Sequence, residues 1–202
     1  MFETLFQDRH MFDSNRHWRK AGFSVDGEGV ESNIMVASHP SAPGYLFKKY
    51  SKKVSLKDQN RNFRARIEGA NKLRRFIATQ GLSRIVVPQK SLLTLPSRFK
   101  RKGRDAYVLV VEKLDLLSGD ESRKRYGKLD SEGLRQLCAA ICRFRGLDSG
   151  VRNVPFTKDG RIAFIDTERW ESKREGKVFL HRIRAYLDRD QQRRVDGLCK
   201  AN

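Results

Sequence analysis

Apolar side chains recur at helical spacing in two long stretches, which predict the main helices of the chain. In residues 55–79 they form a single stripe. The members of this stripe are Phe63, Ile67, Ala70, Leu73 and Ile77. Ser55 and Asp58 stand before it in the order of a capping box, so we expect the helix to begin there. Gly69 weakens this helix locally, which predicts close packing against another segment. Residues 131–145 predict a second helix with an apolar side.

Shorter apolar runs predict the strands. The clearest lie at residues 45–50, 83–87 and 106–111, and weaker ones lie around Val25 and over residues 33–37.

Both ends of the chain carry further apolar residues. Residues 1–20 contain enough of them to pack as a helix on the body of the protein, and residues 178–187 predict another helix. Apolar runs of the roughly 20 residues that a membrane span needs do not occur, and the first residues lack the pattern of a cleavable signal peptide.

Length and charge limit the classes of protein. The 202 residues suit one or two small domains, and the formal net charge is +19. Such a basic surface attracts nucleic acid, an anionic membrane surface or an acidic protein. Lysine and arginine are densest in residues 98–104, 123–128 and 182–194. No zinc spacing, aromatic RNA-binding signature or helix-turn-helix pattern accompanies them. The charge therefore indicates that a partner would be negatively charged, but not which class of molecule it is.

The three cysteines argue against a disulfide framework, because their number is odd and their spacing irregular. Cys138 and Cys142 are one helical turn apart on an apolar stripe, where both are expected to be buried small hydrophobic residues. This composition predicts a reducing, cytoplasmic location.

The most informative stretch is Gly146–Glu168. Asp148 and Asn153 are five residues apart, and Asp166 follows thirteen residues later. Between Asn153 and Asp166 lie a turn signal at 158–160 and an apolar run at 162–165, which together predict a hairpin and a buried strand. Phosphoryl transfer to a hydroxyl uses this set of groups: one carboxylate takes the proton, and an amide oxygen and a second carboxylate hold Mg²⁺. A polar hairpin whose Asp and Asn only complete turns is the alternative.

This stretch resembles the catalytic loop and metal-binding strand of the protein-kinase-like superfamily. The ending Ile165-Asp166-Thr167-Glu168 looks closer to the aminoglycoside-phosphotransferase and choline-kinase branch. Two departures are clear: Gly146-Leu147 stands where a kinase has His-Arg, and Thr167-Glu168 replaces Phe-Gly. The resemblance implies Asp148 as the catalytic base, with Asn153, Asp166 and Glu168 at the metal.

The resemblance also implies a phosphate-binding lysine on a strand. Lys48 in the run 45–50 is chosen for this role, and its neighbour Lys49 would point to the opposite face of the strand. Glu68 on the first long helix would pair with that lysine, and pairing with Lys72 or Arg64 on the helix surface is the alternative.

Two further parts of the nucleotide site follow from the resemblance alone. Gly27 and Gly29 would form the loop over the phosphates, and the backbone from Glu112 to Leu114 would hold the adenine ring. The implied cofactors are ATP and Mg²⁺.

The implied architecture is a two-lobed α+β fold. An extension, 1–21, would pack on an N-lobe of sheet and helix, 22–112, followed by a reduced, mainly helical C-lobe, 113–202. Few residues follow Glu168, which argues against the peptide-docking helices of an ordinary protein kinase. The chain looks like a minimal, divergent bacterial kinase-like protein, a group that includes effectors delivered into host cells.

Three hypotheses follow. The first is an ATP- and Mg²⁺-dependent phosphotransferase that acts on a hydroxyl acceptor, for example on an acidic protein or an anionic surface. The second is a pseudokinase that acts as a binding module. The third is a basic nucleic-acid-binding protein, which explains the charge but not the order of the motifs.

Overall fold

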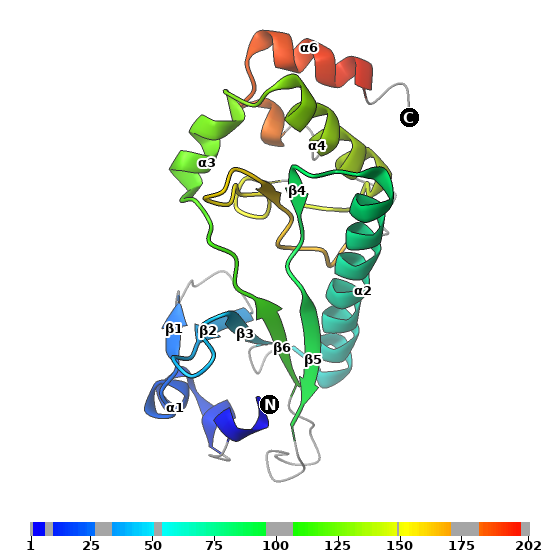
Figure 1. Ribbon diagram of the computed structural model, residues 1–202. Helices are drawn as coiled ribbons and strands as arrows, with labels where there is room; N and C mark the ends of the chain where they lie inside the picture. Colours follow the sequence, from blue (N-terminus) through cyan, green and yellow to red (C-terminus); the bar gives the residue numbers. More distant parts are fainter. Residues whose placement is uncertain are drawn as a thin grey trace. The chain divides into compact units, whose positions relative to one another are not determined.

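The computed structural model describes residues 2–6, 10–26, 34–50, 54–95, 107–148, 150–170 and 182–198. The fold is mixed α+β with a five-stranded antiparallel sheet (Figure 1). Its elements are the 3₁₀ turns η1 (Glu3–Leu5) and η2 (Met11–Asp13); the helices α1 (Asn15–Lys20), α2 (Leu56–Gln80), α3 (Gly119–Tyr126), α4 (Ser131–Arg143) and α6 (Arg189–Leu198); and the strands β1 (Ser24–Asp26), β2 (Ile34–Ser38), β3 (Tyr45–Tyr50), β4 (Ile85–Val86), β5 (Lys90–Thr94), β6 (Tyr107–Glu112) and β7 (Ile162–Ala163).

The chain divides into two compact units. The first consists of Met1–Arg64 and Gln89–Lys113, and the second of Ala65–Pro88 and Leu114–Asn202. Helix α2 therefore contributes its first turns to one unit and its remaining turns to the other.

The first unit is built on the antiparallel sheet, with strand order β1-β2-β3-β6-β5. Phe47 of β3 lies opposite Ala37 of β2 and Val110 of β6, and all three side chains are buried on one face. The N-terminal residues pack on this face through Phe6, Met11 and Trp18. The described residues of this segment form two 3₁₀ turns and one short helix, instead of the single predicted helix.

A serine cap explains where the short helix α1 begins. The Ser14 hydroxyl accepts a hydrogen bond from the backbone N–H of His17 at 3.4 Å, and the backbone of Ser14 is extended. An N-cap residue starts a helix and does not continue one from the residues before it.

The strand predicted at 83–87 is only partly confirmed. Its two paired residues form β4, which runs parallel to β7 in a separate two-stranded sheet of the second unit. One edge strand of the larger sheet is β5, which pairs with β6 and was not predicted. Its sequence, Lys-Ser-Leu-Leu-Thr, lacks the alternation by which a half-buried strand is found.

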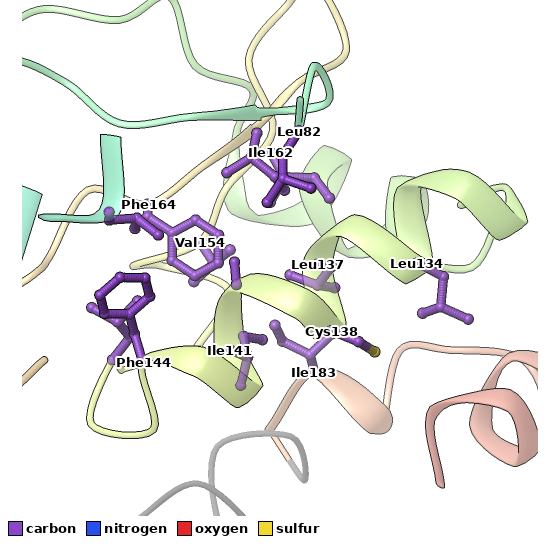
Figure 2. Close-up of a cluster of buried hydrophobic side chains, with 14 of the residues drawn as sticks. Leu82, Leu134, Leu137, Cys138, Ile141, Phe144, Val154, Ile162, Phe164 and Ile183 are labelled. Atoms are coloured by element: carbon purple, nitrogen blue, oxygen red, sulfur yellow. The ribbon is translucent and has the colours of Figure 1, made fainter. Parts of the chain in front are cut away.

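The second unit is organised around α4. Leu134, Leu137 and Ile141 of this helix are buried against Phe164 and Ile183 from later in the chain (Figure 2). The amphipathic pattern predicted this helix, and the structure confirms it.

The cysteines of α4 differ from each other. Cys138 is free and buried, and burial raises the pKa of its thiol to about 12. Cys142 is half-buried and disulfide-bonded, so the prediction of a second reduced, buried cysteine was wrong. A disulfide survives best in an oxidising environment, so the premise for a reducing compartment no longer holds.

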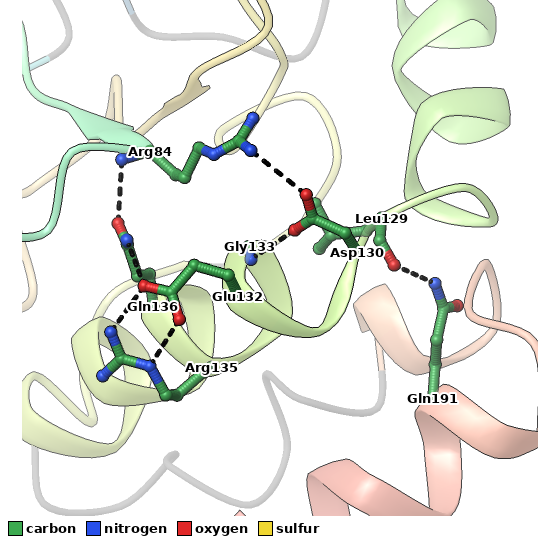
Figure 3. A network of polar contacts seen from close by, with 8 residues as sticks. All are labelled: Arg84, Leu129, Asp130, Glu132, Gly133, Arg135, Gln136 and Gln191. Atoms are coloured by element: carbon green, nitrogen blue, oxygen red, sulfur yellow. Dashed lines mark hydrogen bonds and ion pairs between the residues drawn. The ribbon is translucent and has the colours of Figure 1, made fainter.

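Polar contacts fix the start of α4 (Figure 3). Asp130 caps α4 by accepting from the Gly133 N–H at 2.7 Å, and it also binds Arg84 at 3.1 Å. The Gln191 side chain of α6 donates to the Leu129 carbonyl at 2.7 Å. Helix α6 is thereby joined to the segment before α4.

Glu132 completes this network on the exposed side of α4. Hydrogen bonds from Arg135 and Gln136 lower the pKa of the Glu132 carboxyl to about 2.

Of the helix predicted at 178–187, only residues from 182 onwards lie in the described part. Residues 182–184 are helical and the chain then turns before α6 begins. None of the described helices is both long and apolar enough to cross a membrane.

Candidate functional site

The loop after α4 holds Asp148 and Asn153 in one compact turn. The Asp148 carboxylate accepts a hydrogen bond from the Gly150 N–H at 2.9 Å. The Gly150 carbonyl accepts from the N–H groups of Asn153 at 2.7 Å and Val154 at 2.9 Å. These bonds set the direction of the loop.

Asn153 and Asp166 are brought together by the hairpin that separates them in sequence. The turn at 158–160 forms as predicted, with Gly160 at φ +90°, and β7 is fully buried. The N–H of Ile165, the residue before Asp166, donates to the carbonyl of Asn153 at 3.0 Å. The two predicted metal ligands therefore come from neighbouring, hydrogen-bonded segments.

Helix α3 also contacts this loop. The buried Tyr126 hydroxyl donates to the Val154 carbonyl at 2.6 Å, next to Asn153. Burial raises the pKa of Tyr126, so the hydroxyl keeps its proton and remains a donor at neutral pH.

Arg66 of α2 contacts both carboxylates predicted at the metal. One guanidinium nitrogen, Nη1, lies 3.0 Å from Asp166 Oδ1, and Nη2 forms an ion pair with Glu168 Oε2. The Arg66 side chain is 9% exposed, and those of Asp166 and Glu168 are 29% and 25% exposed. Charge-assisted hydrogen bonds of an arginine fork are among the stronger polar contacts in proteins.

Close packing holds the Asp166–Glu168 segment against α2. The Thr167 hydroxyl, which is buried, donates to the Arg66 carbonyl at 2.6 Å. A Cβ on Gly69 would lie 2.2 Å from the Thr167 carbonyl oxygen and 2.6 Å from the Trp170 ring. The close approach predicted from Gly69 is therefore confirmed. The segment that packs closely against Gly69 is the one that contains Thr167 and Trp170.

The other predicted catalytic carboxylate has a different partner. Arg182 lies 3.0 Å from Asp148 Oδ1, and the side chains are 56% and 35% exposed. This ion pair is open to solvent, unlike that of Arg66.

The residues predicted to hold the cation carry two carboxylates and one amide, which are ligand types that Mg²⁺ accepts. Among the residues that the structure describes, no three side chains from His, Cys, Asp and Glu are grouped as a metal site would require. The predicted ligands Asp166, Glu168 and Asn153 include only two such residues, because asparagine is not one of these four types. The chemistry of the donors fits the cation, and Arg66 supplies positive charge to the same two carboxylates.

The two neighbouring lysines of β3 lie on opposite faces of the sheet. Lys49 is buried, and its Nζ lies 5.7 Å from the ring centroids of both Phe12 and Trp18. Lys48 is half-buried, in register with Val36 of β2 and Leu109 of β6. Lys49 is thus enclosed by the N-terminal aromatic residues, and Lys48 is on the face away from them.

Glu68 is engaged with a neighbour on its own helix. Its carboxylate lies 3.1 Å from Lys72 Nζ, which is the alternative pairing left open by the sequence. Lys72 in turn lies 3.7 Å above the Trp170 ring.

The backbone predicted to hold adenine makes contacts of its own. The N–H of Glu112 donates to the Gln89 carbonyl at 2.9 Å, and that of Lys113 donates to the Gly44 carbonyl at 2.8 Å. Gly27 and Gly29 lie outside the described residues.

Comparison with known proteins assigns no family. No protein-family model matches the chain, and no curated protein matches it significantly.

Two residues of this site, Arg66 and Arg182, were not found from the sequence. Arg66 had a signal, because it lies three residues after Phe63 and four before Ala70, on the buried side of α2. A basic residue on an apolar stripe indicates a buried ion pair. Arg182 lies among many basic residues of the C-terminal region and carried no such signal.

Proposed function

We propose that the protein is a kinase-like phosphotransferase that binds ATP with Mg²⁺ and transfers the γ-phosphoryl group to a hydroxyl. The supporting observation is the Ile165–Asn153 hydrogen bond, which places the segment of Asp166 beside the loop of Asp148 and Asn153. The described elements also follow the expected order, with a lysine on the third strand of the sheet and a long helix after it.

Each residue has a role in this proposal. Asp148, which is more than one-third exposed, orients the acceptor hydroxyl and takes its proton. Asn153, Asp166 and Glu168 would hold Mg²⁺, which supplies positive charge to the phosphate oxygens. Lys48 binds phosphate, since Lys49 is enclosed by aromatic rings.

The acceptor is expected to be anionic. The net charge of +19 favours a hydroxyl carried by an acidic protein or an anionic surface.

A pseudokinase is the second candidate, and the arginine contacts favour it. Asp148, Asp166 and Glu168 each form an ion pair with an arginine. A protein that retains these pairs would bind nucleotide without transferring phosphate, and would act as a binding module.

Two assays separate these candidates. Thermal shift with ATP, with and without Mg²⁺, measures nucleotide binding, because a ligand of the native state raises the melting temperature. Incubation with γ-³²P-ATP then measures transfer to the protein or to added acidic acceptors. Binding with transfer supports the phosphotransferase, and binding without transfer supports the pseudokinase. No response to ATP in either assay contradicts both.

A further inference from the structure

Asp166 and Glu168 already have a cation, the guanidinium group of Arg66. Two different nitrogens of this group contact the two carboxylates, so a single positive charge bridges them. A divalent cation held by the same oxygens would meet this charge at short range. Like charges this close repel strongly where the surroundings limit screening.

The Arg66 backbone is tied to the acidic segment that its side chain binds. Its carbonyl accepts from the Thr167 hydroxyl, and Gly69, one turn further along α2, lets the Thr167 backbone approach closely. The guanidinium is therefore positioned over Asp166 and Glu168 by packing as well as by charge.

We propose that Arg66 is an internal competitor for the divalent cation: its guanidinium and the metal are alternative partners of Asp166 and Glu168. The metal binds when the Arg66 side chain leaves the carboxylates, so Arg66 sets the affinity of the site. This inference rests on the proposed role of Asp166 and Glu168 as metal ligands.

The test is Mn²⁺ binding to the full chain without nucleotide, followed by the electron paramagnetic resonance signal of free Mn²⁺. Arg66→Gln removes the competing charge, and we expect it to bind Mn²⁺ at least about tenfold more tightly than the wild type. The matched control is Arg75→Gln on the exposed side of the same helix, which changes the net charge equally. Its affinity should stay within about twofold of the wild type, because exposed charges are screened.

A second substitution locates the effect. In Arg66→Gln combined with Asp166→Asn, the gain in Mn²⁺ affinity should disappear, because one of the two carboxylates is gone. The proposal is overturned if folded Arg66→Gln binds Mn²⁺ no more tightly than Arg75→Gln, or if the gain persists in the double variant.

Circular dichroism shows whether Arg66→Gln folds, and Arg66→Lys serves if it does not. A lysine keeps the charge but lacks the fork that reaches two carboxylates, so we expect a gain of about threefold in Mn²⁺ affinity. An affinity equal to that of the wild type would contradict the proposal.

The result is independent of the phosphotransferase assay, since neither nucleotide nor acceptor is present. A gain in Mn²⁺ affinity without phosphoryl transfer supports the competition between Arg66 and the metal and contradicts the phosphotransferase activity. Phosphoryl transfer with unchanged Mn²⁺ affinity supports the phosphotransferase activity and contradicts the competition.

Discussion

In the second unit, the arginine contacts of the carboxylates predicted at the site differ in their surroundings. Arg66 is almost completely buried, and its partners Asp166 and Glu168 are about three-quarters buried. Arg182 and Asp148 are separated by the same 3.0 Å as Arg66 and Asp166, but more than half of the Arg182 side chain is exposed. The same kind of ion pair therefore occurs once in a buried environment and once in contact with solvent.

Because of this difference, we expect the Arg66 contacts to contribute to stability and the Arg182 contact to be easily broken. Removing one partner of a buried pair leaves an uncompensated charge, whereas an exposed pair contributes little and is screened by salt. Asp148 can therefore exchange Arg182 for another partner at small cost. Asp166 and Glu168 can exchange Arg66 only for another cation.

The largest expected effect concerns the chemistry. Asp166→Ala should reduce transfer from γ-³²P-ATP by at least about 100-fold, because this carboxylate is proposed to position charge at the transferred group. Asp120→Ala, on an exposed position of α3, is the control and should keep wild-type transfer. Wild-type transfer by Asp166→Ala would rule out the assigned role.

The buried arginine should dominate stability. Arg66→Gln is expected to lower the free energy of unfolding by about 2–3 kcal/mol, since it leaves two partly buried carboxylates without their countercharge. Urea denaturation followed by circular dichroism measures this. A loss no larger than that of Arg182→Gln would show that burial makes no difference between the two pairs.

Packing around the buried pair can be tested at Gly69. Gly69→Ala should lower the free energy of unfolding by about 2 kcal/mol, because its Cβ would meet backbone and the Trp170 ring at less than contact distance. Gly197→Ala is the matched control in α6, where nothing lies within 4 Å of the added Cβ. That variant should be more stable by up to about 1 kcal/mol. Equal effects at both positions would contradict the close packing.

The smallest effect is expected at the exposed pair. Arg182→Gln should change the free energy of unfolding by less than about 1 kcal/mol, and the change should vanish in about 1 M NaCl. Denaturation at low and high salt measures this. A larger loss that survives salt would mean that this pair is as structural as that of Arg66.

Much of the local structure could be predicted from the sequence. Helix α2 follows from the helical periodicity of its apolar residues, and its start follows from the capping pattern at Ser55. The hairpin before Asp166 follows from a turn signal. Each of these signals comes from residues that lie only a few positions apart in the chain. Edge strand β5 could not be predicted, because its sequence lacks an alternating pattern and its strand structure comes from pairing with β6. The broken N-terminal segment and the disulfide of Cys142 were also missed, since tertiary contacts decide both.

The candidate site divides in the same way. The sequence determined the residue types, their order and the hairpin that joins Asn153 to Asp166, because these depend on short-range backbone geometry. Only the tertiary structure decided that Arg66 faces Asp166 and Glu168, and that Lys49 is enclosed while Lys48 is not. Those outcomes depend on which segments pack together, and the free energy of such packing comes from contacts between residues far apart in the chain.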